Sequence, residues 1–405
     1  MRRWVHSKVR DLGQLHTSLR RCADFLQRRR IACATLLLWL PAIGLSQAPL
    51  EREPGGWARV YTATLAAAPK LRVLGHGPVT VDGSASRNVE YTVRISVAAR
   101  TEAEARRILD AAPVRVSTQG DWVVLAAPGG PAMVQVRVKA PHLAALDIAT
   151  TDGAVDVTGV DGTAVVDTRA GAITADRMRG TCKLASGGGD LHVGTVDGSL
   201  ECTTAAGRIQ VKLVRSNAVL NTYGGDIEVD EVDGALRADT AGGGIHVHKA
   251  GGTVAATSGG GPIVVDQAKG AVTARDLAGP VAVSAAAGVH CESGSGGIRL
   301  ARIAGPMRVS TSLGSILADL AGARLVDSFL ATASGDITVL IPSNVGVNIR
   351  AVNSMADTLR RIVSDYPALP PRRMGSRIVA EGALNGGGPL LEISDTGGTI
   401  FIKRQ

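Results

Sequence analysis

ALDIATTDGAVDVTGVDG (residues 145–162) is followed by TAVVDTRAGAITADRMRG (163–180) and TCKLASGGGDLHVGTVDG (181–198), and these three stretches of eighteen residues align without gaps. The same period continues to residue 323 and gives ten lines, once one missing residue near Val289 is allowed for. All ten lines have glycine at the ninth position: Gly153, Gly171, Gly189, Gly207, Gly225, Gly243, Gly261, Gly279, Gly296 and Gly314. Chance does not produce such a column, so the chain contains an internal repeat.

Apolar residues occupy four further columns of this repeat. In the first line they are Leu146 and Ile148 at the second and fourth positions, and Val155 and Val157 at the eleventh and thirteenth. Each pair has the period of two that is typical of a strand with one buried face. Each line therefore predicts two short strands joined by turns, in which glycine permits a positive φ or close stacking of backbones.

Identical residues at a constant spacing indicate that every coil runs in the same direction, because antiparallel hairpins would reverse the residue order. The sequence thus predicts an all-β protein, a parallel β-solenoid with 18-residue coils. Its flattened coil lacks the six-residue spacing of left-handed hexapeptide helices, which favours a right-handed solenoid. A single coil buries too little apolar surface to be stable alone, so we expect capping structures at both ends.

The first 48 residues are predicted to be a signal peptide. A basic start that ends in RRR (28–30) precedes an apolar stretch at 31–45, and small residues suit cleavage between Gly44 and Ala48. The apolar stretch is shorter than the roughly 20 residues of a membrane-crossing helix, so we expect an extracytoplasmic protein with no transmembrane span in the mature chain. Residues 1–30 carry +7 of the net charge of +8, and the nearly neutral remainder indicates no nucleic-acid partner.

Three further segments follow the signal peptide. Residues 49–140 are expected to be a small mixed piece of strands with a capped helix at 101–112, in which LRVLGHGPVTVDG (71–83) resembles one more coil. Residues 141–323 form the solenoid of ten 18-residue coils, and residues 324–405 form C-terminal coils and an irregular cap. In this last segment, LLEISDTGGTIFI (390–402) returns to the register of the repeat.

The mature chain keeps three cysteines, Cys182, Cys202 and Cys291, an odd number without the CxxC spacing of a metal or redox motif. Cys182 and Cys202 fall at inward positions of neighbouring coils, along a diagonal too long for an easy disulfide bond. We expect all three to be small, buried apolar residues.

Three motifs in the C-terminal part carry a resemblance to a known family. They are SGDITVLIP (334–342), NGGGP (385–389) and GGTIFI (397–402). With the G-x-I-x-V coils before them, they resemble the bacterial "putative adhesin" family of β-strand-repeat envelope proteins, over residues 71 to 405. The resemblance implies the same fold, a location in the bacterial periplasm or at the cell surface, and an adhesive role. It supplies no catalytic residues.

Metal-ligating side chains gather at outward positions of three successive lines: Glu228, Asp230, His246, His248 and Asp266. Side chains two apart on a strand, or level on neighbouring coils, stand about 5–7 Å apart, within reach of one metal ion. A solvated face on which acids and imidazoles alternate to relieve like-charge stacking is the more ordinary interpretation. At position seventeen, residues of opposite charge alternate up the stack and predict a salt-bridge ladder: Asp161, Arg179, Asp197, Arg215 and Asp233.

Several enzyme and cofactor classes fit this sequence poorly. There is no GxSxG or HExxH motif, the tenth position lacks the regular Asp of a calcium-binding repeat, and no cofactor is expected. Tyr223 is the only aromatic residue between 145 and 323, which leaves little surface for stacking a sugar ring.

The sequence therefore favours a non-catalytic, exported structural or adhesion-type protein that contacts an envelope protein or a cell-wall polymer. Two alternatives stay open. One is a polysaccharide-active β-helix enzyme, a lyase or hydrolase, because carboxylate pairs are easily found on acidic ladders. The other is a metal-binding surface protein.

Overall fold

The computed structural model describes residues 49–66, 68–83, 87–111, 113–130, 132–141, 143–322, 324–355 and 361–405. The chain divides into two units, of which only the second, Ala42–Gln405, contains described residues. The expected signal peptide and its cleavage region lie outside the described residues, so the fold described below is that of the second unit.

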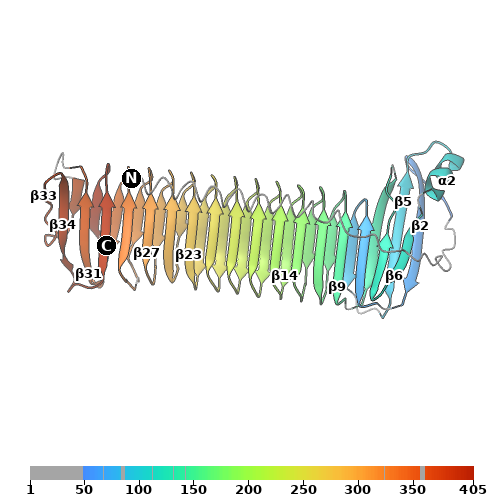
Figure 1. Cartoon of the computed structure of the whole chain (residues 1–405), viewed down its shortest axis with the longest axis horizontal. Coiled ribbons are helices and arrows are strands. Elements are labelled where there is room, and N and C mark those ends of the chain that lie inside the picture. Colours follow the sequence, from blue (N-terminus) through green and yellow to red (C-terminus); the bar gives the residue numbers. More distant parts are fainter. Residues whose placement is uncertain are drawn as a thin grey trace. The chain divides into compact units, whose positions relative to one another are not determined.

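The repeat folds into a parallel β-solenoid, as the sequence predicts (Figure 1). The eleventh and thirteenth positions lie on the strands of one sheet, sheet A: β10 (Val155–Thr158), β12 (Ile173–Asp176), β14 (Leu191–Val196), β16 (Ile209–Val214), β18 (Ile227–Val232), β20 (Ile245–Ala250), β22 (Ile263–Ala268), β24 (Val281–Val283), β26 (Ile298–Ala301) and β28 (Ile316–Asp319). The second and fourth positions lie on the strands of sheet B: β9 (Ala145–Thr150), β11 (Thr163–Thr168), β13 (Cys182–Ser186), β15 (Leu200–Thr204), β17 (Ala218–Thr222), β19 (Leu236–Thr240), β21 (Val254–Ser258), β23 (Ala271–Asp276), β25 (Gly288–Ser293) and β27 (Met307–Thr311). Neighbouring strands of these coils are parallel and pair identical positions, such as Ile227 with Ile245.

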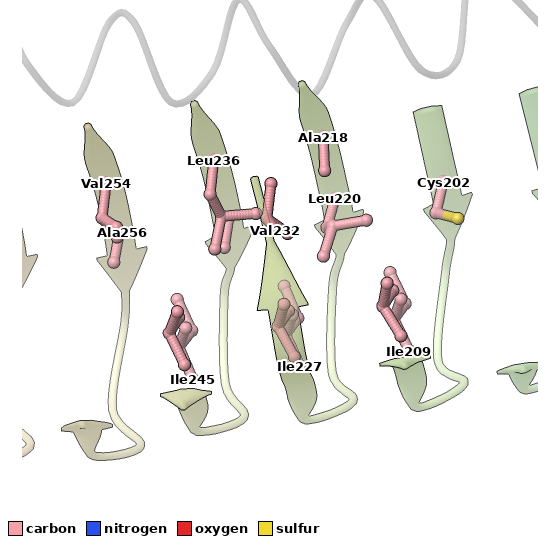
Figure 2. Packing of buried hydrophobic residues seen from close by; sticks show 14 of the residues in the cluster. Cys202, Ile209, Ala218, Leu220, Ile227, Val232, Leu236, Ile245, Val254 and Ala256 are labelled. Carbon is pink, nitrogen blue, oxygen red and sulfur yellow. The ribbon is translucent and has the colours of Figure 1, made fainter. Parts of the chain in front are cut away.

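The core lies between the two sheets. Figure 2 shows Ile209, Ile227 and Ile245 of sheet A in one row, with Leu220 and Leu236 of sheet B in another. The sixteenth position adds a fifth buried column, which the four columns read from the sequence do not include: Val160, Met178, Val196, Val214, Val232, Ala250 and Ala268. A coil thus buries about five aliphatic side chains, each contributing roughly 1.5–3 kcal/mol when fully removed from water.

The three cysteines among the described residues lie in this core, as predicted. Cys182, Cys202 and Cys291 are buried and free of disulfide bonds. Burial raises the pKa of Cys182 and that of Cys291 to about 12, because the thiolate would have to form away from water. These thiols are therefore unreactive packing groups.

The ninth-position glycines are required by the close approach of successive coils. A Cβ atom on Gly225 would lie 2.0 Å from the carbonyl oxygen of Gly207, and one on Gly243 would lie 2.1 Å from that of Gly225. Among the ten glycines, all of them within the described residues, only Gly153 has a positive φ, of 110°. Glycine was expected in these turns either for a positive φ or for close stacking of backbones. Close stacking is therefore the reason at nearly all of these positions.

A column of buried hydroxyl groups at the sixth position connects these turns, and the sequence analysis did not identify it. Thr222 Oγ1 donates to the Gly207 carbonyl of the preceding coil (3.0 Å) and accepts from the Gly225 N–H of its own coil (3.2 Å). The same two hydrogen bonds recur at Ser186, Thr204, Thr240, Ser258 and Thr311. Each hydroxyl links two coils and pairs backbone groups that would otherwise be buried without partners.

The N-terminal coil lies inside the stack. Strands β3 (Lys70–Gly75) and β4 (Val79–Gly83) form the additional coil that the sequence predicts, and pair with β9 and β10 of the first repeat. On their other side they pair with strands that come later in the chain, β7 (Trp122–Ala126) and β8 (Met133–Ala140). The coil made of β7 and β8 is therefore the outer one.

Antiparallel strands continue both sheets beyond β7 and β8: β5 (Val89–Val97), β2 (Gly56–Leu65) and β1 (Glu51–Glu53) in sheet A, and β6 (Arg115–Gln119) in sheet B. Helix α2 (Glu102–Asp110) contacts β2 and β5. Its N-cap Thr101 accepts a hydrogen bond from the Glu104 N–H, in the capping arrangement that the sequence predicts. The described N-terminal residues therefore form strands and one short helix before the first repeat.

The C-terminal coil is also inserted between two others. Strands β29 (Ser328–Thr332) and β30 (Ile337–Ile341) continue the stack as an eleventh coil, and a further coil follows with β31 (Val347–Asn353) and β32 (Ile362–Ser364). Between them lie the last two strands of the chain: β35 (Leu390–Asp395) pairs with β29 and β31, and β36 (Ile400–Arg404) pairs with β30 and β32. Antiparallel strands β34 (Arg377–Leu384) and β33 (Arg372–Met374) extend sheet B beyond β31.

Candidate metal centre

Two imidazoles and a carboxylate stand on the outer face of sheet A, on neighbouring strands. His246 and His248 flank the buried Val247 on β20, so the alternation of the strand directs both rings to the solvent side. Asp266 follows the buried Val265 on β22, and Val247 pairs with Val265 in the parallel ladder. The three side chains are 39%, 43% and 44% exposed.

The carboxylate of Asp266 contacts both rings through one oxygen. Its Oδ2 lies 3.1 Å from His246 Nε2 and 2.9 Å from His248 Nδ1, and the two ring centroids are 4.0 Å apart. Because an ionised carboxylate only accepts hydrogen bonds, both nitrogens act as donors. Partial burial acts to raise the pKa of Asp266, but the hydrogen bonds with His248 and His246 outweigh it and hold that pKa below its ordinary value.

The structure brings together three of the five candidates from the sequence. One ligand atom each from His246, His248 and Asp266 lies within 4.8 Å of the other two. Glu228 pairs with His246 in the ladder, but its carboxylate accepts a hydrogen bond from Gln210 Nε2 on the other side (3.0 Å). Asp230 is exposed on β18 and is not part of the three-residue group. The column positions place all five residues on neighbouring strands, whereas the direction of each side chain decides which ligand atoms come together.

A charged ladder lies at position seventeen of the first five repeats, as predicted. Arg179 lies 3.2 Å from Asp161, and Arg215 lies 3.2 Å from Asp197 and 4.0 Å from Asp233. All of these pairs are solvent-exposed, so each contributes at most about 1 kcal/mol to stability. They create a surface on which charges of opposite sign alternate from one coil to the next.

A second imidazole–carboxylate pair was not singled out from the sequence. His290 Nε2 lies 3.1 Å from Glu292 Oε1 on β25, and Arg275 Nε lies 3.5 Å from the other oxygen of Glu292. The signal that could have identified it is the H-x-E spacing on a strand, which places both side chains on one face. This pair has only one imidazole, and its carboxylate also contacts a guanidinium group. It therefore has fewer ligand atoms available for a metal ion than the first group has.

A shallow depression of about 390 Å³ lies on the same sheet, over the three coils that precede the coil of His246 and His248. Its lining is almost entirely polar or small: Asp190, His192, Ala206, Arg208, Gln210, Gly224, Gly225 and Asp226. Its two carboxylates are already engaged. Asp190 Oδ1 accepts from the Arg208 N–H (2.8 Å), and Asp226 Oδ2 accepts from the Arg208 guanidinium (3.3 Å).

In the part of the chain that the structure describes, no helix is both long and apolar enough to cross a membrane. No family model matches this chain, and no curated protein matches it in sequence.

Similar solved structures include a "putative cell adhesion protein" from Clostridium sporogenes, at 10% identity and a TM-score of 0.18 over 86% of this chain and 100% of that one. Another is a "putative adhesin" from Bacteroides fragilis, at 10% identity and a TM-score of 0.23 over 86% of this chain and 97% of that one. A "putative lipid binding protein" from Parabacteroides distasonis has 12% identity and a TM-score of 0.23 over 85% of this chain and 96% of that one. Two of these three descriptions name the adhesin class that the sequence motifs resemble, but similarity at this level carries no argument about function, which rests on the chain's own residues.

Proposed function

We propose that this protein is a non-catalytic, exported structural protein of the adhesion type, whose solenoid offers an extended surface to an envelope protein or a cell-wall polymer. The observation that supports the proposal is the repetition of outward polar side chains along the stack, as in the ladder of Arg179 and Arg215 with their aspartates. A partner with its own repeating groups meets the same charge of this ladder at every second coil, roughly every 9.6 Å.

Repetition makes weak contacts sufficient for binding. One exposed ion pair or hydrogen bond holds a partner poorly, but contacts on several coils act together once the first has formed, because the others become intramolecular. Since the ladder charges are exposed, we expect such binding to weaken with salt.

The same surface gives little support to the polysaccharide-active alternative. Tyr223, 39% exposed, is the only aromatic residue in the ten repeats, so a sugar ring finds little to stack upon. In the shallow depression on sheet A, both carboxylates, those of Asp190 and Asp226, already accept hydrogen bonds from Arg208. Neither feature supports a catalytic site in which one residue acts as a general acid or a nucleophile on a glycosidic bond.

Co-sedimentation with cell-wall sacculi and a panel of neutral and acidic polysaccharides tests the proposal on the exported protein. We expect binding to at least one polymer, reduced in Arg179→Glu/Arg215→Glu, and no release of reducing or unsaturated ends. Arg106→Glu/Arg107→Glu on α2 changes the charge equally and serves as the control. Release of such ends that disappears in Asp230→Asn and His248→Ala would overturn the proposal in favour of an enzyme.

Export is tested separately by mass spectrometry of the mature protein. Small residues between Gly44 and Ala48 suit the peptidase, and Pro49 disfavours a cut directly before it, so we expect a new N-terminus near Gln47. Recovery of the chain with an intact Met1 from the envelope fraction would contradict this part of the proposal.

A further inference from the structure

We propose that His246, His248 and Asp266 form a binding site for one divalent transition-metal ion, of the class to which Zn²⁺, Ni²⁺ and Cu²⁺ belong. This inference goes beyond the adhesive role, which needs no metal. It rests on the position of three ligand atoms: Nε2 of His246, Nδ1 of His248 and Oδ2 of Asp266.

The distances within the group are close to those of a ligand shell. With metal–ligand bonds of about 2.0–2.1 Å, the corners of a tetrahedral site lie roughly 3.3 Å apart. The two nitrogens of this group lie 3.1 Å and 2.9 Å from Asp266 Oδ2. The remaining edge, between the two nitrogens, is within 4.8 Å and shortens by rotation of the rings.

The solenoid holds these ligands in place before any ion arrives. Val247 and Val265 are 0% exposed and pair directly, which fixes the backbone on either side of all three ligands. An ion therefore does not have to bring distant parts of the chain together, and the entropy lost on binding is confined to a few side-chain torsions. A site on paired strands is also more rigid than one on a loop.

Among the described residues, the ion pairs of Asp266 are with His246 and His248 and include no lysine or arginine. Lys249 is the nearest lysine in sequence to the imidazoles, and its ammonium group is paired with Glu231 on the neighbouring strand. Glu228, level with His246 on β18, adds negative charge beside the group. The local field therefore favours a cation.

The donor set selects the class of ion. Two imidazole nitrogens and one carboxylate oxygen suit Zn²⁺, Ni²⁺ or Cu²⁺, whereas Mg²⁺ and Ca²⁺ prefer shells of oxygen alone. Three protein ligands leave at least one coordination position open for water or for a group of whatever contacts this face.

Two other histidines provide internal controls. His192 occupies the same position on β14 as His246 on β20, but its partners in the ladder are Thr174 and Gln210. His290 has one carboxylate neighbour, Glu292, which Arg275 also contacts. Neither has a second imidazole among its recorded contacts, so both should bind a metal ion far more weakly.

Calorimetric titration of untagged, EDTA-treated protein with Zn²⁺ tests the site, because an affinity tag would bind the ion itself. We expect one equivalent of Zn²⁺ per chain, and an affinity at least ten-fold lower in each of His246→Ala, His248→Ala and Asp266→Asn. His192→Ala and His290→Ala should bind as the unaltered protein does. Titration with Ca²⁺ should give no comparable binding.

Electron paramagnetic resonance of bound Cu²⁺ identifies the ligands independently of affinity. We expect hyperfine coupling to two imidazole nitrogens in the unaltered protein and to one in His248→Ala. Urea midpoints in EDTA establish that the variants fold, as expected for side chains this exposed. Absence of stoichiometric Zn²⁺ binding, Zn²⁺ binding that survives His246→Ala/His248→Ala, or equal affinity for Ca²⁺ would each overturn the proposal.

Discussion

Asp276 occupies the sixth position of its coil, where neighbouring coils have Thr or Ser. It is only 4% exposed. Its Oδ1 accepts hydrogen bonds from the N–H groups of Gly279 (2.6 Å) and Ala278 (2.8 Å), but its Oδ2 has no partner among the described residues. A hydroxyl at this position donates to the preceding coil, which an ionised carboxylate cannot do. Burial consequently raises the pKa of Asp276, although the two backbone N–H groups act to lower it.

The first prediction follows from the sign of this shift. Because folding favours the protonated form of Asp276, its contribution to stability is complete below the ordinary Asp pKa of about 3.9 and is lost as the pH rises through the raised value. Asp276→Thr restores the hydroxyl donor and should stabilise the protein at pH 7 by about 1–3 kcal/mol. Urea unfolding from pH 3.5 to 8 should show this gain shrinking towards low pH.

Asp395 provides the contrast. Burial also raises its pKa, but its Oδ2 accepts a hydrogen bond from Asn353 Nδ2 (3.1 Å). Asp395→Thr removes that acceptor and should destabilise the protein at pH 7. Stabilisation by both substitutions, or by neither, would contradict the role assigned to the unpaired oxygen of Asp276.

A second prediction at the residue scale concerns the faces of the strands. Ile227→Asp places a carboxylate among stacked aliphatic side chains, where Ile227 is 1% exposed, and should cost about 4 kcal/mol or more. Val219→Asp, on a side chain 37% exposed on the neighbouring sheet, should cost less than about 1 kcal/mol. Denaturant midpoints of the two variants measure the difference, and equal midpoints would mean that the assigned faces are wrong.

At the scale of the element, the coil turns depend on glycine for space between backbones. Two adjacent glycines differ sharply in this respect: a Cβ on Gly225 would lie 2.0 Å from a backbone oxygen, whereas one on Gly224 would meet nothing within 4 Å. Backbone cannot move aside as a flexible side chain can, so successive coils would have to separate at Gly225.

The third prediction compares these two positions. Gly225→Ala should destabilise the protein by more than about 2 kcal/mol, because the added methyl group overlaps the preceding coil. Gly224→Ala should be neutral or stabilising by up to about 1 kcal/mol, through the lower entropy of the unfolded chain. Thermal unfolding of the pair gives the result, and a larger loss at Gly224 than at Gly225 would show that the stacking of backbones does not limit substitution.

The columns of the repeat explain how much of the fold could be predicted from the sequence. The columns that begin with Leu146 and Val155 predicted the two strands of a coil. The period of two identified their inward faces, and the period of eighteen identified the coil. The place of the terminal coils could not be predicted in the same way. Leu71 and Leu391 carry the same column pattern as every repeat, so the pattern fits any level of the stack equally well.

The candidate site was predictable to the same depth. The columns placed His246, His248 and Asp266 on one face, since outward positions repeat with the coil. They could not exclude Glu228, whose carboxylate turns towards Gln210. The column at position six can be seen in the sequence as repeated Thr and Ser. Its contribution to stability depends on a hydrogen bond between successive coils, which can be identified only in the folded structure.

At the scale of the whole molecule, both ends of the stack are closed by insertion. The coil of β3 and β4 lies between β9/β10 and β7/β8, and the coil of β35 and β36 lies between β29/β30 and β31/β32. A terminal coil in a simple solenoid has one neighbour, whereas each of these has two. The inserted coils therefore attach the capping strands to the repeats, and their loss should separate the cap from the stack.

The last prediction tests this arrangement by ending the chain after Leu384. Removal of β35 and β36 breaks two interfaces in each sheet and leaves a gap one coil wide, roughly 4.8 Å more than a strand pair can span. Hydrogen exchange should show that Val347–Asn353 loses protection at the amides that face β35, although β34 still pairs with its other edge. Strands β16 to β20 should keep their protection, because coils interact mainly with their nearest neighbours. Removal of Glu51–Glu53, which pairs only with β2, is the control and should leave protection of the cap unchanged. If Val347–Asn353 stayed protected in the shortened chain, the cap would be held by contacts other than the inserted coil.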